Sequence, residues 1–199
     1  MRYLLISVMV LLMSVSARAE PRGSLGMSVD REWDTGEAFV SKREVYCALL
    51  VSRLAKRGSG PTYVKKTERS YASRMKTCME IAYAAEARNL GLTFVLSLAW
   101  EEAKFDSSAV SDAGAYGPLQ VLPKYWCPKR RLRGCNLIEA GLDAIEMLSG
   151  KYETLYEVAC HYNGGVRCNK YSKAYAMRIL AMQQRLEIFH RWLIEYGGE

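Results

Sequence analysis

The chain has 199 residues, of which half are apolar, and its 28 Lys and Arg against 21 Asp and Glu give a net charge of +7. This length suits one domain with a sizeable core rather than two. A basic surface favours polyanions, and nucleic acid is one of these. The sequence has no zinc-finger spacing, RNP-like aromatic motif or glycine-rich phosphate loop, so nucleic-acid binding is not expected.

The first 19 residues have the pattern of a secretory signal peptide. Arg2 precedes an apolar run over residues 3–15, and an Ala-Arg-Ala cleavage pattern ends at residue 19. The run is too short to span a bilayer of about 30 Å as a helix, although a retained N-terminal anchor is the alternative. We predict a signal peptide at residues 1–19 and a periplasmic or extracellular mature chain without stable membrane insertion. Cleavage removes two Arg and no acid, which leaves a net charge of about +5.

The rest of the chain carries mainly helical periodicity. Residues 20–36 are polar and contain glycines, and we expect a flexible leader there. Apolar residues recur at helical spacing over about 37–56, 67–89 and 94–103, with a break at Gly58-Ser59-Gly60-Pro61. Glycines and prolines allow only short helical pieces within 105–128. Helices are expected again at about 136–150, 153–162 and 172–195. The pattern predicts a mostly α globular domain.

Six cysteines follow the signal peptide, an even number that suits disulfides in an oxidising compartment. They are Cys47, Cys78, Cys127, Cys135, Cys160 and Cys168. Six cysteines allow 15 pairings. Sequence proximity favours Cys127–Cys135 and Cys160–Cys168, which leaves Cys47–Cys78. No C-x-x-C pair is present, and the two histidines lack ligand spacing, so we expect neither a metal nor another cofactor.

A candidate catalytic acid lies at the end of the helix predicted at 94–103. At about 100° per residue, the apolar side chains of this helix define a face centred near about 70°, and Glu102 falls at about 80°. Its neighbour Glu101 falls at about 340°. A carboxyl group aligned with a buried face has a raised pKa and stays protonated near neutral pH, as a general acid requires. Periodicity alone leaves open a solvated Glu102 at the helix end.

The residues from Glu102 to Pro123 resemble the lytic transglycosylase family of the soluble (SLT) type, which shares its lysozyme-like fold with goose-type lysozymes. In that family, a catalytic Glu precedes a Ser, an aromatic residue, a run of small residues and Gly-Leu-Met-Gln. An Ala-Tyr-Asn motif follows about forty residues later and corresponds to His161-Tyr162-Asn163 here. A late Tyr on the last long helix corresponds to Tyr175. The resemblance covers roughly residues 77–196.

The resemblance implies roles for individual residues. Glu102 is the acid/base, Ser111 orients the glutamate or the substrate, and Tyr175 reaches Glu102. The other implied substrate-binding residues are Gly117, Leu119 and Gln120 in one turn and Tyr162 and Asn163 on the opposite wall. The sequence departs from the family at Ala103 for Ser, at Pro118-Leu119 for Leu-Met and at Cys160-His161 for small residues.

Several of these residues also have a structural alternative. Tyr162 and Tyr175 could be core aromatics, Asn163 could cap a helix, and Gln120 could be a surface residue. Asp106 could cap a turn rather than act as a second catalytic carboxylate.

The number of carboxylates distinguishes two reactions. Hydrolytic glycosidases usually use two Asp or Glu residues, and the nearest downstream acids, Asp106 and Asp112, lie in turn-prone sequence. A single acid is what a lytic transglycosylase needs, so the resemblance implies cleavage of the MurNAc–GlcNAc β-1,4 bond with formation of 1,6-anhydroMurNAc. Hydrolysis by a goose-type muramidase, and a non-catalytic peptidoglycan-binding protein of an envelope assembly, are the alternatives.

The predicted organisation has four parts. A signal peptide at 1–19 and a leader at 20–36 precede an N-terminal helical extension at 37–76 and an SLT-like catalytic domain at 77–199. Peptidoglycan glycan strands are the expected partner. The extension is interpreted either as additional packing or as a surface for an envelope-complex partner.

Overall fold

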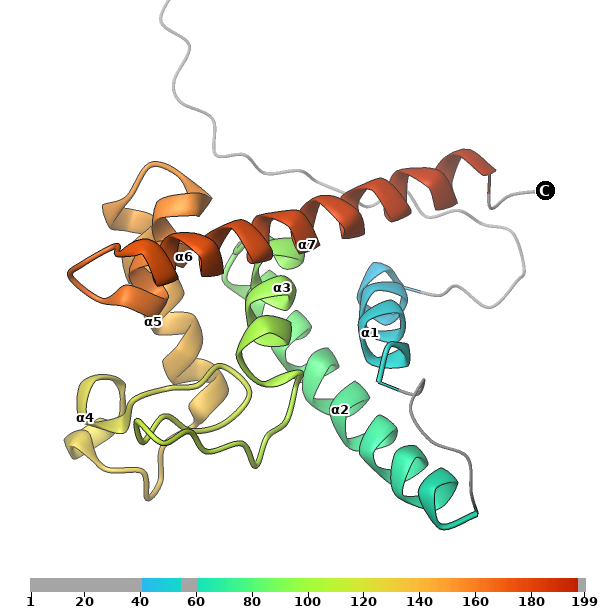
Figure 1. Ribbon diagram of the computed structural model, residues 1–199, viewed down its shortest axis with the longest axis horizontal. Helices are drawn as coiled ribbons and strands as arrows, with labels where there is room; N and C mark the ends of the chain where they lie inside the picture. The colour runs from blue at the N-terminus through green and yellow to red at the C-terminus, as the bar shows by residue number, and fades with distance from the viewer. Residues whose placement is uncertain (1–40, 55–60, 197–199) are drawn as a thin grey trace, which may run out of the picture. The chain divides into compact units, whose positions relative to one another are not determined.

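The computed structural model describes residues 41–54 and 61–196, without the side chains of 61–69 and 196 (Figure 1). The predicted signal peptide and leader therefore lie outside the described residues. The helices are α1 Lys42–Ser52, α2 Pro61–Ala87, α3 Leu92–Ala103, α4 Pro123–Trp126, α5 Leu137–Lys151, α6 Leu155–Gly164 and α7 Lys170–Tyr196, with a short 3-10 helix η1 at Pro128–Arg130. This confirms the predicted mostly α fold with additional N-terminal helices. No helix in the described ranges is both long and apolar enough to cross a membrane.

The bounds of the first two helices differ from the prediction. The helix expected over about 37–56 is α1, which begins after Ser41. The Ser41 hydroxyl accepts a hydrogen bond from the backbone of Glu44, and the Glu44 carboxylate accepts one from the backbone of Ser41. This capping box fixes the start of the helix. The second helix begins at Pro61 rather than near residue 67, because proline is well accommodated in the first turn of a helix.

Helix α3 forms the centre of the core. Its residues 94–100 are all buried, and Val95, Leu96 and Leu98 have no exposed surface. Helix α2 packs against α3, and α7 begins beside α6 and then crosses α3 (Figure 1). An acid in the last turn of α3 is therefore held by a helix that the surrounding core fixes on several sides.

The three predicted cysteine pairings are confirmed. Cys47–Cys78 joins α1 to α2, and Cys127–Cys135 closes the loop that contains η1. Cys160–Cys168 joins α6 to the segment before α7. A disulfide commonly adds about 2–4 kcal/mol to stability, which is useful for a chain with so much irregular structure between α3 and α5.

The segment from residue 104 to 122 has no helix and is held by two isolated bridges at Tyr116, to Val110 and to Val121. Helix α5 packs directly on this segment at Gly141. A Cβ atom at Gly141 would lie 2.6 Å from the Cβ atom of Leu119, which is itself fully buried. The absence of a side chain at Gly141 therefore allows the close approach that fixes the turn around Leu119.

Substitution of Gly141 by Ala should destabilise the protein. The new methyl group overlaps Leu119, and overpacking of this kind costs about 1–3 kcal/mol, which outweighs the gain of up to about 1 kcal/mol in helix propensity. Gly150→Ala is the matched control, because it lies in the same helix with no atom within 4 Å of its Cβ position. Urea unfolding of both variants measures the difference, and equal stabilities would contradict the role assigned to Gly141.

Candidate active site

Glu102 lies in the last turn of α3, and its carboxyl group is bound by a tyrosine of α7, the last helix of the described residues. The Tyr175 hydroxyl of α7 donates a hydrogen bond to Oε1 of Glu102 at 2.5 Å. Burial raises the pKa of Glu102 to about 7, the Tyr175 hydrogen bond and Lys104 act to lower it, and the charge of Glu101 acts to raise it. A carboxyl group with this pKa can both donate and accept a proton near neutral pH.

The adjacent Glu101 has a different environment. Arg178 of α7 donates a hydrogen bond from Nε to Oε1 of Glu101 at 2.6 Å, and the ammonium group of Lys104 lies 4.0 Å from Oε2. Glu101 is therefore neutralised by cations, whereas Glu102 receives a neutral hydroxyl. Two side chains of α7 thus give these consecutive acids different partners, a neutral hydroxyl for Glu102 and a cation for Glu101.

Two tyrosines, Tyr162 and Tyr175, lie near Glu102. Burial raises the pKa of both Tyr162 and Tyr175 well above the usual value, and the nearby Glu102 carboxylate adds to the effect. Both hydroxyls stay protonated and act as donors. Tyr162 donates to the backbone oxygen of Leu119 at 2.7 Å and so joins α6 to the turn at 117–120.

The turn at 117–120 is stabilised by the side chain of its last residue, Gln120. Gln120 has a left-handed φ of 47°, and its Nε2 donates to the backbone oxygen of Gly117 at 2.9 Å. Ser111 accepts a hydrogen bond from the backbone of Ala115 at 3.1 Å. Asn163 is exposed at the end of α6. In the part of the chain that the structure describes, none of Ser111, Gln120 and Asn163 has a hydrogen bond to Glu102.

Asp106 is engaged in local structure. Its carboxylate accepts hydrogen bonds from the backbone and the hydroxyl of Ser108, and Nη2 of Arg74 lies 3.0 Å away. The Ser108 hydroxyl and backbone, together with Arg74, hold the pKa of Asp106 below its usual value, against a smaller effect of burial. These contacts agree with the interpretation of Asp106 as a turn residue. Asp112 is exposed.

Arg74 was not among the predicted site residues. From α2 it donates to the backbone oxygens of Ala103 at 3.2 Å and Lys104 at 2.6 Å, where the last carbonyls of α3 lack helical partners. Lys104 and Phe105 both have left-handed φ angles, 53° and 62°. The Arg74 guanidinium therefore holds the strained turn that directly follows Glu102. The contact spans about thirty residues of sequence, and no local pattern indicates it.

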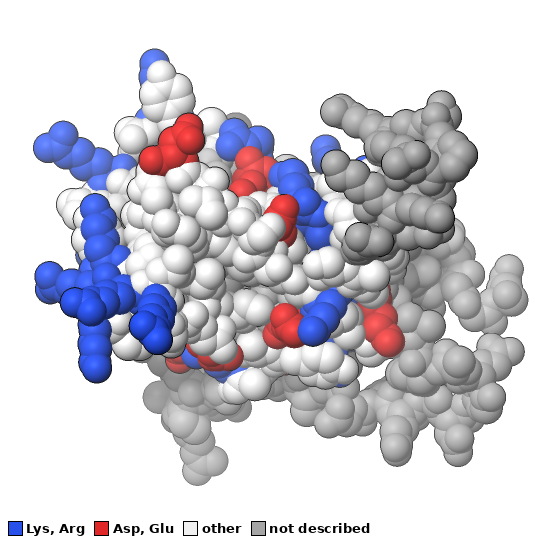
Figure 2. All heavy atoms as spheres, turned by 90° about the horizontal axis from the view of Figure 1, so that it is seen from below, with Lys and Arg blue, Asp and Glu red and all other residues white. Residues whose placement is uncertain are grey.

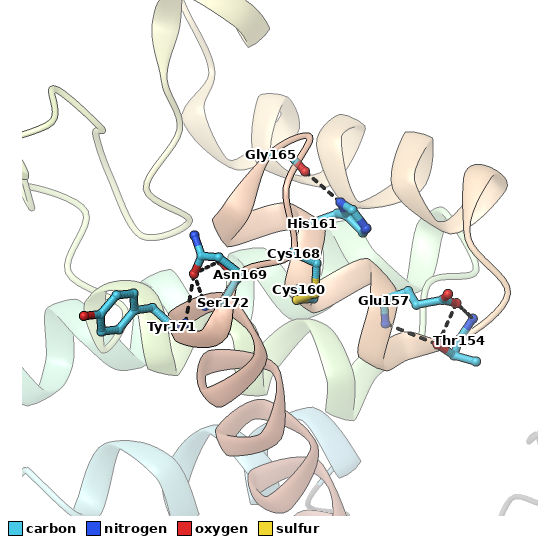
Figure 3. Close-up of a disulfide and its surroundings, with 9 residues drawn as sticks. All are labelled: Thr154, Glu157, Cys160, His161, Gly165, Cys168, Asn169, Tyr171 and Ser172. Atoms are coloured by element: carbon cyan, nitrogen blue, oxygen red, sulfur yellow. Dashed lines mark hydrogen bonds between the residues drawn. A yellow bond between two sulfur atoms is a disulfide. The ribbon is translucent and has the colours of Figure 1, made fainter.

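The Cys160–Cys168 disulfide connects α6 to the segment directly before α7 (Figure 3). His161 stacks on Tyr152, with ring centroids 4.2 Å apart, and its Nδ1 is 2.7 Å from the backbone oxygen of Gly165. The side chain of Asn169 accepts hydrogen bonds from the first backbone N–H groups of α7. The disulfide thus fixes Tyr162 and Tyr175, which lie on these two helices, relative to each other.

The model of the transglycosylase SLT domain family matches residues 79–180. The chain belongs to this family. No curated protein and no solved structure matches the chain. The SLT match contains Glu102, Tyr162 and Tyr175, whereas α1 and Arg74 precede it. Among the residues with described positions, no group of three or more His, Cys, Asp or Glu could hold a metal ion.

The raised pKa of Glu102 predicts a pH-dependent effect on stability. Because the folded pKa of about 7 exceeds the unfolded value of about 4.5, the folded state binds more protons between these values. The contribution of the protonated carboxyl is complete below about pH 4.5 and is lost as the pH rises through 7. Glu102→Gln should therefore stabilise the protein at pH 8 by on the order of 2 kcal/mol, with little effect at pH 4.5.

Urea unfolding at the two pH values measures this difference. The control is Glu101→Gln, which should not stabilise the protein, because it removes the ion pair with Arg178. A Glu102→Gln effect independent of pH would contradict the burial of an ionisable carboxyl at this position.

Proposed function

We propose that this SLT-domain protein is a peptidoglycan lytic transglycosylase that cleaves the MurNAc–GlcNAc β-1,4 bond without hydrolysis, with Glu102 as its single acid/base. The observation that carries the proposal is the partly buried Glu102 carboxyl with a pKa of about 7, bound by Tyr175. SLT domains act on peptidoglycan outside the cytoplasm, which agrees with three disulfides and with the predicted signal peptide.

In the first step, the protonated Glu102 donates its proton to the glycosidic oxygen. The bond between this oxygen and C1 of MurNAc breaks, and GlcNAc leaves with a free 4-hydroxyl. In the second step, the Glu102 carboxylate removes the proton from the 6-hydroxyl of the same MurNAc, and O6 bonds to C1. The products are a free GlcNAc end and a 1,6-anhydroMurNAc end, no water is consumed, and Glu102 is protonated again.

The surrounding residues support this sequence of steps. The Tyr175 hydrogen bond orients the carboxyl and stabilises its ionised form, while burial stabilises the protonated form. The balance suits a group that must act first as an acid and then as a base. Tyr162, Asn163 and Gln120 are proposed to bind the sugar, as is Ser111, whose hydroxyl caps the loop before the 117–120 turn in this structure.

The basic surface is compatible with this substrate. Lys and Arg side chains gather at one edge of the face shown in Figure 2. On the Cys127–Cys135 loop, Lys129, Arg130, Arg131 and Arg133 are all exposed. Peptidoglycan carries carboxylates on its peptide stems, so a basic surface favours its approach.

Digestion of purified murein tests the proposal. Mass spectrometry should find glycan ends that are one water molecule lighter than hydrolysis products, and hydrolysed ends would instead support a muramidase. Glu102→Gln should lower the rate by about 10²–10⁴-fold, the usual effect of losing a general acid/base. Glu101→Gln is the matched control and should retain most of the activity. Unchanged lysis by Glu102→Gln would contradict Glu102 as the acid/base, whereas the absence of lysis by the parent protein would favour a non-catalytic peptidoglycan-binding protein.

The Cys160–Cys168 disulfide should matter more for activity than the Cys127–Cys135 disulfide. The two close loops of equal length, with a sequence separation of 8 residues each, so their effects on chain entropy are comparable. Only Cys160–Cys168 ties α6, which carries Tyr162, to the segment directly before α7, which carries Tyr175. The Cys160→Ala/Cys168→Ala variant should lose several-fold more activity than Cys127→Ala/Cys135→Ala at similar melting temperatures. Equal losses of activity would contradict this role.

A further inference from the structure

One face of α7 follows the acidic end of α3. Tyr171, Tyr175 and Arg178 occur at positions i, i+4 and i+7 of the helix, and side chains at this spacing share a face. Tyr175 binds Glu102, and Arg178 binds Glu101. Tyr171 begins the same row of side chains, one helical turn before the residue that contacts the proposed acid/base.

The Tyr171 side chain is not part of the core. It is 72% exposed, and within the described residues its hydroxyl has no hydrogen bond. The ammonium group of Lys170 lies 4.9 Å from the ring centroid. Figure 3 shows the ring extending away from α7 and from the Cys160–Cys168 disulfide. A packing role therefore does not explain an aromatic residue here.

The backbone that carries this ring is nevertheless held firmly. Oδ1 of Asn169 accepts hydrogen bonds from the backbone N–H of Tyr171 at 2.9 Å and of Ser172 at 3.1 Å. Cys168, which directly precedes Asn169, forms a disulfide with Cys160 of α6. The start of α7 also lies close to the end of α6, because a Cβ atom at Gly164 would be 2.4 Å from the Ser172 hydroxyl. An exposed aromatic ring on a fixed backbone loses little conformational entropy when it binds a ligand.

We propose that the Tyr171 ring is a stacking platform for a sugar of the glycan strand, adjacent to the bond that Glu102 acts on. The inference rests on the proposed function, because it places the scissile bond at Glu102. Pyranose rings have apolar C–H faces, and a tyrosine ring offers an apolar face with a polar tip. Residues at i and i+4 have Cβ atoms about 6 Å apart, so a strand bound at Glu102 can reach Tyr171 with a neighbouring sugar.

Binding of a soluble MurNAc–GlcNAc tetrasaccharide to the Glu102→Gln protein tests the platform without turnover. Tyr171→Ala in this background should weaken binding about tenfold, which corresponds to about 1.4 kcal/mol, whereas Tyr171→Phe should bind normally. Tyr125→Ala is the matched control, because Tyr125 is also exposed, at 67%, and also has the preceding lysine over its ring. In the active enzyme, Tyr171→Ala should raise KM with kcat changed by less than about twofold.

Two outcomes would overturn the inference: equal binding by the Tyr171→Ala and parent proteins, or an equal loss in Tyr125→Ala. Circular dichroism and melting temperature verify that each variant folds. Failure of the proposed function gives a different result. In that case Glu102→Gln retains full lytic activity, while the comparison of the tyrosine variants in binding still decides whether Tyr171 contacts the sugar.

Discussion

The hydrogen bond between Tyr175 and Glu102 is the constraint on which the rest of the site depends. It joins the end of the buried helix α3 to α7, and its acceptor is a carboxyl group whose pKa is raised by burial to about 7. The donor is a neutral hydroxyl rather than a cation. Asp106 has the opposite balance, because hydrogen bonds from Ser108, together with Arg74, outweigh burial and hold its pKa below the usual value. The proton affinity of Glu102 is therefore set first by burial, which the Tyr175 hydrogen bond partly offsets.

Several distant segments meet around this bond. Tyr162 from α6 contacts the 117–120 turn, and Arg74 from α2 holds the backbone after Glu102. The Cys160–Cys168 disulfide and the Asn169 cap fix the start of α7. Each contact uses a backbone oxygen, a backbone N–H group or a covalent link. The geometry consequently depends on positions of the main chain that are already fixed by the core.

The sequence predicted the helices well, because their apolar periodicity is strong, and it predicted two disulfides from proximity and the third as the remaining pair. Periodicity also separated Glu102 from Glu101, and the two side chains do have different partners in the structure. The start of α1 was missed because Ser41 and Glu44 form a capping box inside the predicted helix. Arg74 was missed because its partners are backbone oxygens about thirty residues away. Contacts of that kind leave no pattern in a single sequence.

The position of Arg74 has a consequence for how much of the chain the site needs. The family match begins at residue 79, yet Arg74 and Cys78, whose disulfide joins α2 to α1, precede it. The matched range contains Glu102 and Tyr175 without the group that holds the turn between α3 and Asp106. The part of the chain that holds the site is thus longer than the range matched by the family model, and a fragment beginning at residue 79 would lack both Arg74 and the disulfide to α1.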